Sequence, residues 1–88
     1  MLSDDEIIKI AKEVATANDV GFVDITTEPA IDSEGAAAVM IKIAIPTGSA
    51  AGLGSRTART VSQLIGQLAD AGEQRFPIIR YEGKGAAP

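Results

Sequence analysis

The sequence predicts a small α+β domain, a two-layer α/β sandwich whose elements follow in the order helix, strand, strand, helix, strand. Two stretches repeat apolar residues at intervals of three and four, which is the pattern of an amphipathic helix. Two others alternate apolar and polar residues on either side of a turn-rich segment, which indicates an antiparallel hairpin. Each helix has one apolar stripe and the hairpin has one aliphatic face. Both helices are therefore expected on one face of the sheet.

The first predicted helix covers residues 4–17. Ser3 and Glu6 have the spacing of a capping box, in which each side chain bonds to the backbone amide of the other residue. The acidic residues that follow Ser3 also suit the positive end of the helix dipole. The apolar stripe consists of Ile7, Ile10, Ala11, Val14 and Ala17. Asn18, Asp19 and Gly21 are expected to end this helix.

The hairpin is predicted from two alternating segments, 22–28 and 36–45, joined by Pro29 and a turn over residues 32–35. The aliphatic face is expected to contain Val23, Ile25, Thr27, Ala37, Val39, Ile41, Ile43 and Ile45. A turn centred on Ser33 sets Ile25 opposite Ile41, Val23 opposite Ile43 and Asp24 opposite Lys42. The last of these is a favourable cross-strand pair of opposite charges.

The second predicted helix covers about 56–71, with Ser55 or Thr57 as its cap. Its stripe is Ala58, Val61, Leu64, Ile65 and Leu68, and Gly72 suits the left-handed position after a helix end. Residues 76–81 indicate a short third strand. Because Pro77 cannot donate a ladder hydrogen bond, it is expected in an edge strand or at the strand start. Residues 1–82 are expected to form one domain and residues 83–88 a disordered tail.

The composition excludes several kinds of chemistry. Among its 88 residues the chain has no cysteine and no histidine, so thiol nucleophiles, Ser–His–Asp triads and Cys/His zinc sites are ruled out. The acidic side chains do not have the spacing of a calcium loop, so we expect neither a metal nor a cofactor. Nothing places two acid–base groups in a shared cleft, so a non-enzymatic protein is expected.

Charge and hydropathy bear on location and partners. The net charge is −4, and an acidic chain is poorly suited to general binding of nucleic acid. The amino-terminal residues lack the basic and apolar regions of a signal peptide, and no apolar run approaches the roughly 20 residues that span a bilayer. We therefore expect a cytoplasmic protein with no membrane contact.

Two surfaces are candidates for function. The sheet face opposite the helices is expected to be semi-apolar and to bind a protein, either a second copy or a larger complex, through Phe22, Met40, Ile79 and Tyr81. The alternative is an anion or RNA site at the glycine-rich segment 47–55 and the start of the second helix. Its residues are Gly52, Gly54, Ser55, Arg56 and Arg59. The segment matches neither a P-loop nor a dinucleotide fingerprint.

Overall fold

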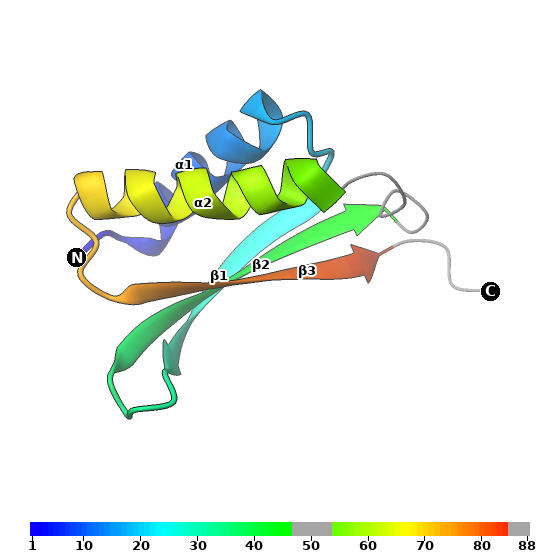
Figure 1. Cartoon of the computed structure of the whole chain (residues 1–88). Helices are drawn as coiled ribbons and strands as arrows, with labels where there is room; N and C mark the ends of the chain where they lie inside the picture. Colours follow the sequence, from blue (N-terminus) through cyan, green and yellow to red (C-terminus); the bar gives the residue numbers. More distant parts are fainter. Residues whose placement is uncertain (47–53, 85–88) are drawn as a thin grey trace.

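The computed structural model describes residues 1–46 and 54–84 and confirms the predicted α+β fold and element order (Figure 1). The elements are α1 (Asp4–Ala17), β1 (Asp24–Ile31), β2 (Ala37–Pro46), α2 (Gly54–Asp70) and β3 (Phe76–Lys84). The three strands form one sheet in the order β1-β2-β3, so β2 is central and the other two strands are edges.

Helix α1 has the predicted bounds because both of its ends are specified locally. The Ser3 hydroxyl accepts from the Glu6 amide, and the Glu6 carboxylate accepts from the Ser3 amide, which confirms the capping box. At the other end, Asp19 has a positive φ of 60°, and the next amide, that of Val20, donates to the carbonyl of Ala15. These bonds satisfy carbonyls that a helix end otherwise leaves open.

Strand β1 differs from its predicted range. It starts at Asp24 and continues through Pro29 to Ile31, because an edge strand tolerates a proline whose nitrogen points away from the ladder. The turn that follows is held by the Asp32 carboxylate, which accepts from the amides of Glu34 and Ala36. Gly35 completes it with a φ of 84°. Val23, expected on the core face, is 59% exposed.

The hairpin is antiparallel as predicted, but its register differs from the prediction by two residues. Ile25 lies opposite Ile43 and Thr26 lies opposite Lys42, so the turn is centred one residue later than Ser33. A shift of two leaves the parity unchanged, so the residues of the paired segments keep their expected faces and change only their partners. Lys42 consequently bonds to Glu28, with 3.3 Å between Nζ and Oε1, and not to Asp24.

Strand β3 pairs with β2 in parallel, and α2 supplies the crossover that a parallel connection requires. Pro77 is its second residue, in agreement with the expectation of an edge strand or a strand start. The strand is nine residues long and not short, and it includes Gly83 and Lys84, which the sequence prediction places in the tail. Residues 85–88 of that predicted tail lie outside the described residues.

Helix α2 begins at Gly54, earlier than predicted, so Ser55 and Thr57 lie inside the helix and do not cap it. Thr60, Leu64 and Leu68 face the core, whereas Ala58 is exposed and Val61 and Ile65 are half-buried. After the helix, Gly72 has a φ of 103°, as expected, and the amide of Glu73 donates to the carbonyl of Leu68.

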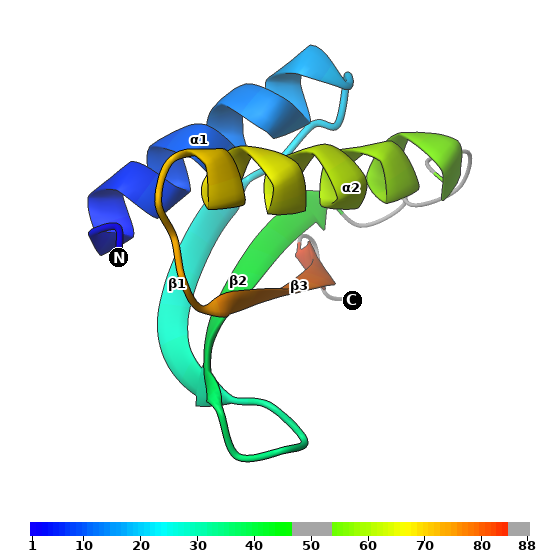
Figure 2. The same cartoon turned by 60° about the vertical axis from the view of Figure 1, so that its left-hand side comes forward.

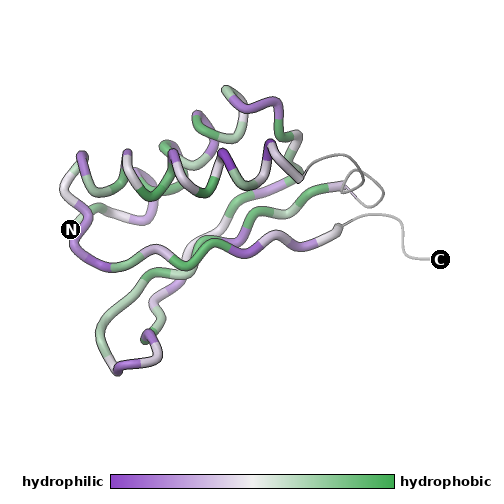
Figure 3. The backbone as a smooth tube through the Cα atoms, viewed as in Figure 1, coloured by the Kyte–Doolittle hydropathy of each residue, from purple (hydrophilic) through white to green (hydrophobic). Residues whose placement is uncertain are grey.

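Two layers enclose the core: in Figures 1 and 2 both helices lie on the same side of the sheet. α1 contacts β1 and α2, and α2 contacts β3. Figure 3 shows hydrophobic residues along β2 and hydrophilic residues at the hairpin turn. The hairpin end carries Ala37, expected in the core but exposed, and Ile31, which is 73% exposed. The core consists of Ile7, Ala11, Val14, Ala15, Val20, Ile25, Val39, Ile41, Ile43, Ile45, Leu64 and Leu68.

Candidate interaction surface

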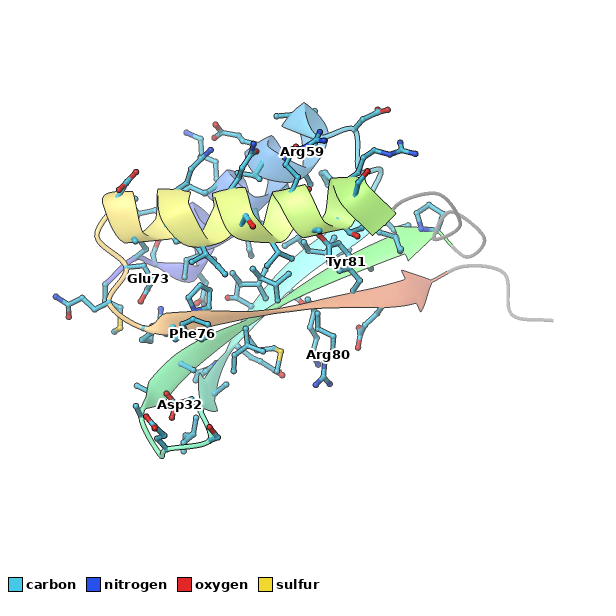
Figure 4. All side chains as sticks on the ribbon, viewed as in Figure 1. Asp32, Arg59, Glu73, Phe76, Arg80 and Tyr81 are labelled. Carbon is cyan, nitrogen blue, oxygen red and sulfur yellow. The ribbon has the colours of Figure 1, made fainter. Side chains whose placement is uncertain are left out.

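The sheet face that points away from the helices carries the even-numbered residues of all three strands. Met40 is paired with Glu28 on one side and with Ile78 on the other, and Lys42 is paired with Thr26 and Arg80. Residues paired in this way point to the same face of a sheet. We call this the outer face; its side chains are Thr26, Glu28, Ala38, Met40, Lys42, Ala44, Phe76, Ile78, Arg80 and Glu82. In Figure 4, Arg80 points away from the helices.

One end of the outer face is apolar. Phe76, which is opposite Ala38 in the register, is 57% exposed, and the neighbouring pair Met40 and Ile78 is half-buried. The prediction that Met40 lies on this face is therefore confirmed. Large apolar groups that stay in water cost free energy, and their clustering often marks a contact surface.

The other end of the outer face is charged. Lys42 bonds to Glu28 in the neighbouring strand, and Arg80 lies opposite Lys42 on the other side. Arg80 is thus placed beside a like charge. No ion pair between described residues involves Arg80 or Glu82. Their two charges are available for interactions outside the molecule.

Three of the residues predicted to bind a partner do not lie on the outer face. Ile79 and Tyr81 have the opposite parity to Arg80, so they point toward the helices and pack against the core, and Phe22 also packs there. The Tyr81 hydroxyl donates to the carbonyl of Thr57 at 3.1 Å (Figure 4). Burial raises the pKa of Tyr81, because it disfavours the charged phenolate. Phe22, Ile79 and Tyr81 therefore pack at the edge of the core.

The two edges of the sheet are protected to different degrees. In β1, Pro29 is the sixth of eight residues, and its ring and missing amide hinder pairing with another chain. In β3, Pro77 lies near the start and leaves residues 78–84 without a proline. The longer uninterrupted edge belongs to β3.

One flank of α2 is apolar and lies on the β3 side. The opposite flank faces α1, because the Gln63 side chain accepts from the Asn18 amide group at 2.8 Å. Tyr81 of β3 reaches Thr57, and helical spacing places Val61 and Ile65 one and two turns further on the same side. The α2 flank consists of Ala58, Val61, Ile65 and Ala69, which are exposed or half-buried. The partly buried apolar side chains packed against the core are Leu2, Ile8, Ile10, Phe22, Ile79 and Tyr81, none of them from α2.

The residues predicted to hold an anion lie in the first two turns of α2, except Gly52, which is outside the described residues. Gly54 and Ser55 open the helix and are exposed, as is Arg59. Arg56 donates from Nη1 to the Asp19 carbonyl at 3.2 Å and to its carboxylate at 3.3 Å. Its charge therefore lies at the end of α1, where a cation suits the helix dipole. Anion binding stays a prediction.

The buried ion pair between Glu73 and Arg75 was not predicted from the sequence. The Glu73 side chain is fully buried, and its carboxylate accepts from Nε and Nη2 of Arg75 at 2.9 and 3.0 Å. It also accepts from the amides of Arg75 and Leu2. Hydrogen bonding from Arg75 is the main cause that lowers the pKa of Glu73 to about 2. Every bond is internal, so the pair fastens the chain and offers no free group to a ligand.

Further features of the described residues bear on chemistry. Residues 1–46 and 54–84 contain no pocket and no group of three acidic side chains placed to hold a metal ion. No helix in the same part of the chain is long and apolar enough to cross a membrane.

Comparisons with protein-family models, curated proteins and solved structures find no match.

Proposed function

We propose that the protein is a non-enzymatic interaction module that binds another protein chain through β3 and the adjoining outer face. The observation that carries this proposal is the edge strand β3, nine residues long, with exposed Phe76 on its outer side. An open edge presents a row of backbone donors and acceptors that an added strand can pair.

The side chains around this edge support the proposal. Phe76, Ile78 and Met40 supply an apolar area, and Arg80 and Glu82 supply two charges of opposite sign beside it. Apolar side chains with charged side chains beside them are a common composition of a protein–protein contact. The added strand gains backbone hydrogen bonds, and the outer face adds selectivity through its side chains.

Site-specific photo-crosslinking in the native cells tests this function. A photoreactive amino acid replaces Ile78 on the outer face or, in the matched control, Lys12 on the exposed side of α1. We expect a discrete adduct from position 78 and none from position 12. Its mass reports whether the bound chain is a second copy or a different protein. Equal labelling from both positions, or no adduct from position 78, contradicts the proposal.

A further inference from the structure

We propose that the chain bound at β3 is a second copy, whose β3 pairs antiparallel with this one around Tyr81. This inference rests on the proposed function and names its partner. The two sheets then join into one sheet of six strands, related by a two-fold axis that passes between the two Tyr81 residues. A closed two-fold contact of this kind requires a surface that is complementary to itself.

The backbone of β3 presents the groups that such pairing needs. The Ala44 carbonyl accepts from the Val23 amide, so it points toward β1, and the adjacent carbonyls of Ile43 and Ile45 point toward β3. In a parallel ladder these residues bond to the even-numbered residues of β3. The amides and carbonyls of the odd residues Ile79, Tyr81 and Gly83 then face the open edge, on the side to which Pro77 also directs its nitrogen.

The charges of β3 select this register. Centring on Tyr81 sets Arg80 opposite Glu82 of the partner subunit, and Glu82 opposite the partner's Arg80. These are the pairs without direct hydrogen bonds, in which opposing side chains come closest. Centring on Arg80 or on Glu82 sets two like charges opposite each other. The charges that find no ion pair within the described chain are thus matched by a second copy.

Gly83 also suits this register. It lies opposite Ile79 of the partner subunit, and a glycine leaves space for that larger side chain. Glycine within a strand is otherwise unfavourable and often marks a close approach of another chain.

The α2 flank gives independent support. A two-fold axis perpendicular to the sheet keeps the helices of both copies on the same side, so the two α2 helices become neighbours across the axis. The surface that each presents there contains Val61 and Ile65, with Ala58 and Ala69 at its margin. Small and branched apolar residues allow two helices to pack closely. The dimer buries apolar groups that the monomer leaves partly in water.

Charge reversal tests the register. Arg80→Glu makes both positions acidic and Glu82→Arg makes both basic, so each variant alone opposes like charges twice across the axis. Sedimentation equilibrium is expected to show a dissociation constant raised about tenfold or more for each single variant. An equimolar mixture of the two variants, and the double variant with both changes, restores opposite charges and is expected to recover dimerisation.

Lys12→Glu and Glu13→Lys change the same kinds of charge on the exposed side of α1 and serve as controls, expected to dimerise like the wild type. Circular dichroism confirms that each variant is folded. A wild type that stays monomeric up to millimolar concentration overturns the self-pairing, as does a dimer indifferent to both reversals. If the crosslink from position 78 then has the mass of a different protein, the proposed function stands and only the second copy is wrong.

Discussion

Glu73 joins three parts of the chain through one buried carboxylate. It follows the end of α2, bonds to Arg75 just before β3, and accepts from the amide of Leu2 before α1. A buried carboxylate is stable only when its charge is matched and its oxygens are bonded, and these contacts meet both conditions. The residue therefore matters to stability and not to binding.

Glu73→Gln is expected to lower the free energy of unfolding by about 2 kcal/mol, because hydrogen bonds to a charged group are lost and Arg75 is left unpaired. Urea denaturation measures the change. Glu13→Gln, on the exposed side of α1, is the control and is expected to change stability by less than about 0.5 kcal/mol. Equal effects from the two substitutions would show that the buried pair has no special role.

The same carboxylate predicts how stability depends on pH. Its pKa is about 2 in the folded chain, against an ordinary value of 4.5, so the folded state favours the charged form. The stability that Glu73 supplies is complete above pH 4.5 and is lost as the pH falls toward 2. The wild type should therefore lose more stability between pH 5 and 2 than Glu73→Gln does, as measured by urea midpoints at each pH.

Thr27 has a buried hydroxyl that no described residue bonds. It lies opposite Ile41 on the helix side of the sheet. Thr27→Val keeps nearly the same shape and removes the unpaired polar atom, so we expect the free energy of unfolding to rise by about 1 kcal/mol. Thr26→Val, at the exposed neighbouring position, is the control with an expected change near zero. A loss of stability in Thr27→Val would mean that the hydroxyl is bonded after all.

At the scale of elements, the helix ends account for much of the local specificity, as a comparison of one glycine inside α2 with another just after its end shows. Gly72 needs its positive φ of 103°, whereas Gly66 lies inside the helix with open space around its Cα. Gly72→Ala is expected to lower the free energy of unfolding by about 1 kcal/mol, because a Cβ strains the left-handed conformation. Gly66→Ala is expected to raise it by about 0.5–1 kcal/mol through helix propensity.

Thermal denaturation of these two variants checks the prediction, and each is the control for the other because the chemical change is the same. If both substitutions changed the free energy of unfolding in the same direction, backbone conformation would not be what decides the effect. Because Gly66 is exposed, better packing cannot explain a rise in the stability of Gly66→Ala.

The elements differ in how far the sequence alone could place them. α1 was predicted with its true bounds, because the capping box and the Asn18–Asp19 end are local signals. The predicted hairpin register was wrong by two residues. The alternation of apolar and polar residues shows which sheet face a side chain lies on, whereas its cross-strand partner depends on the geometry of the turn. In β3, apolar residues occur at both parities, so the pattern could not tell that Ile79 and Tyr81 face the core and Ile78 does not.

The candidate site was predictable only in part for a related reason. Met40 follows from the alternation of β2, but Phe76, Ile78, Arg80 and Glu82 join it only through the parallel pairing of β3. That pairing is a long-range property of the chain. A local signal for the α2 flank did exist, since the predicted stripe of α2 was wider than one core face uses.

At the scale of the whole molecule, the order β1-β2-β3 places α1 and α2 unequally. α1 packs on β1 and on one side of α2, so the opposite side of α2 and the edge of β3 remain uncovered together. A second copy that pairs through β3 covers both at once. The surface is uncovered because only two helices pack on the sheet, and no further helix lies beside α2 on the β3 side in the described part of the chain.

This geometry predicts that stability depends on protein concentration. If the folded chain dimerises and the unfolded chain does not, the apparent melting temperature of the wild type should rise by several degrees over a hundredfold range of concentration. Val61→Glu places a charge on the α2 flank and should remove this dependence while the dilute protein melts at nearly the same temperature. Lys12→Glu should behave like the wild type. If Val61→Glu keeps the full dependence, the α2 flank lies outside the contact, and pairing must occur through the strands alone.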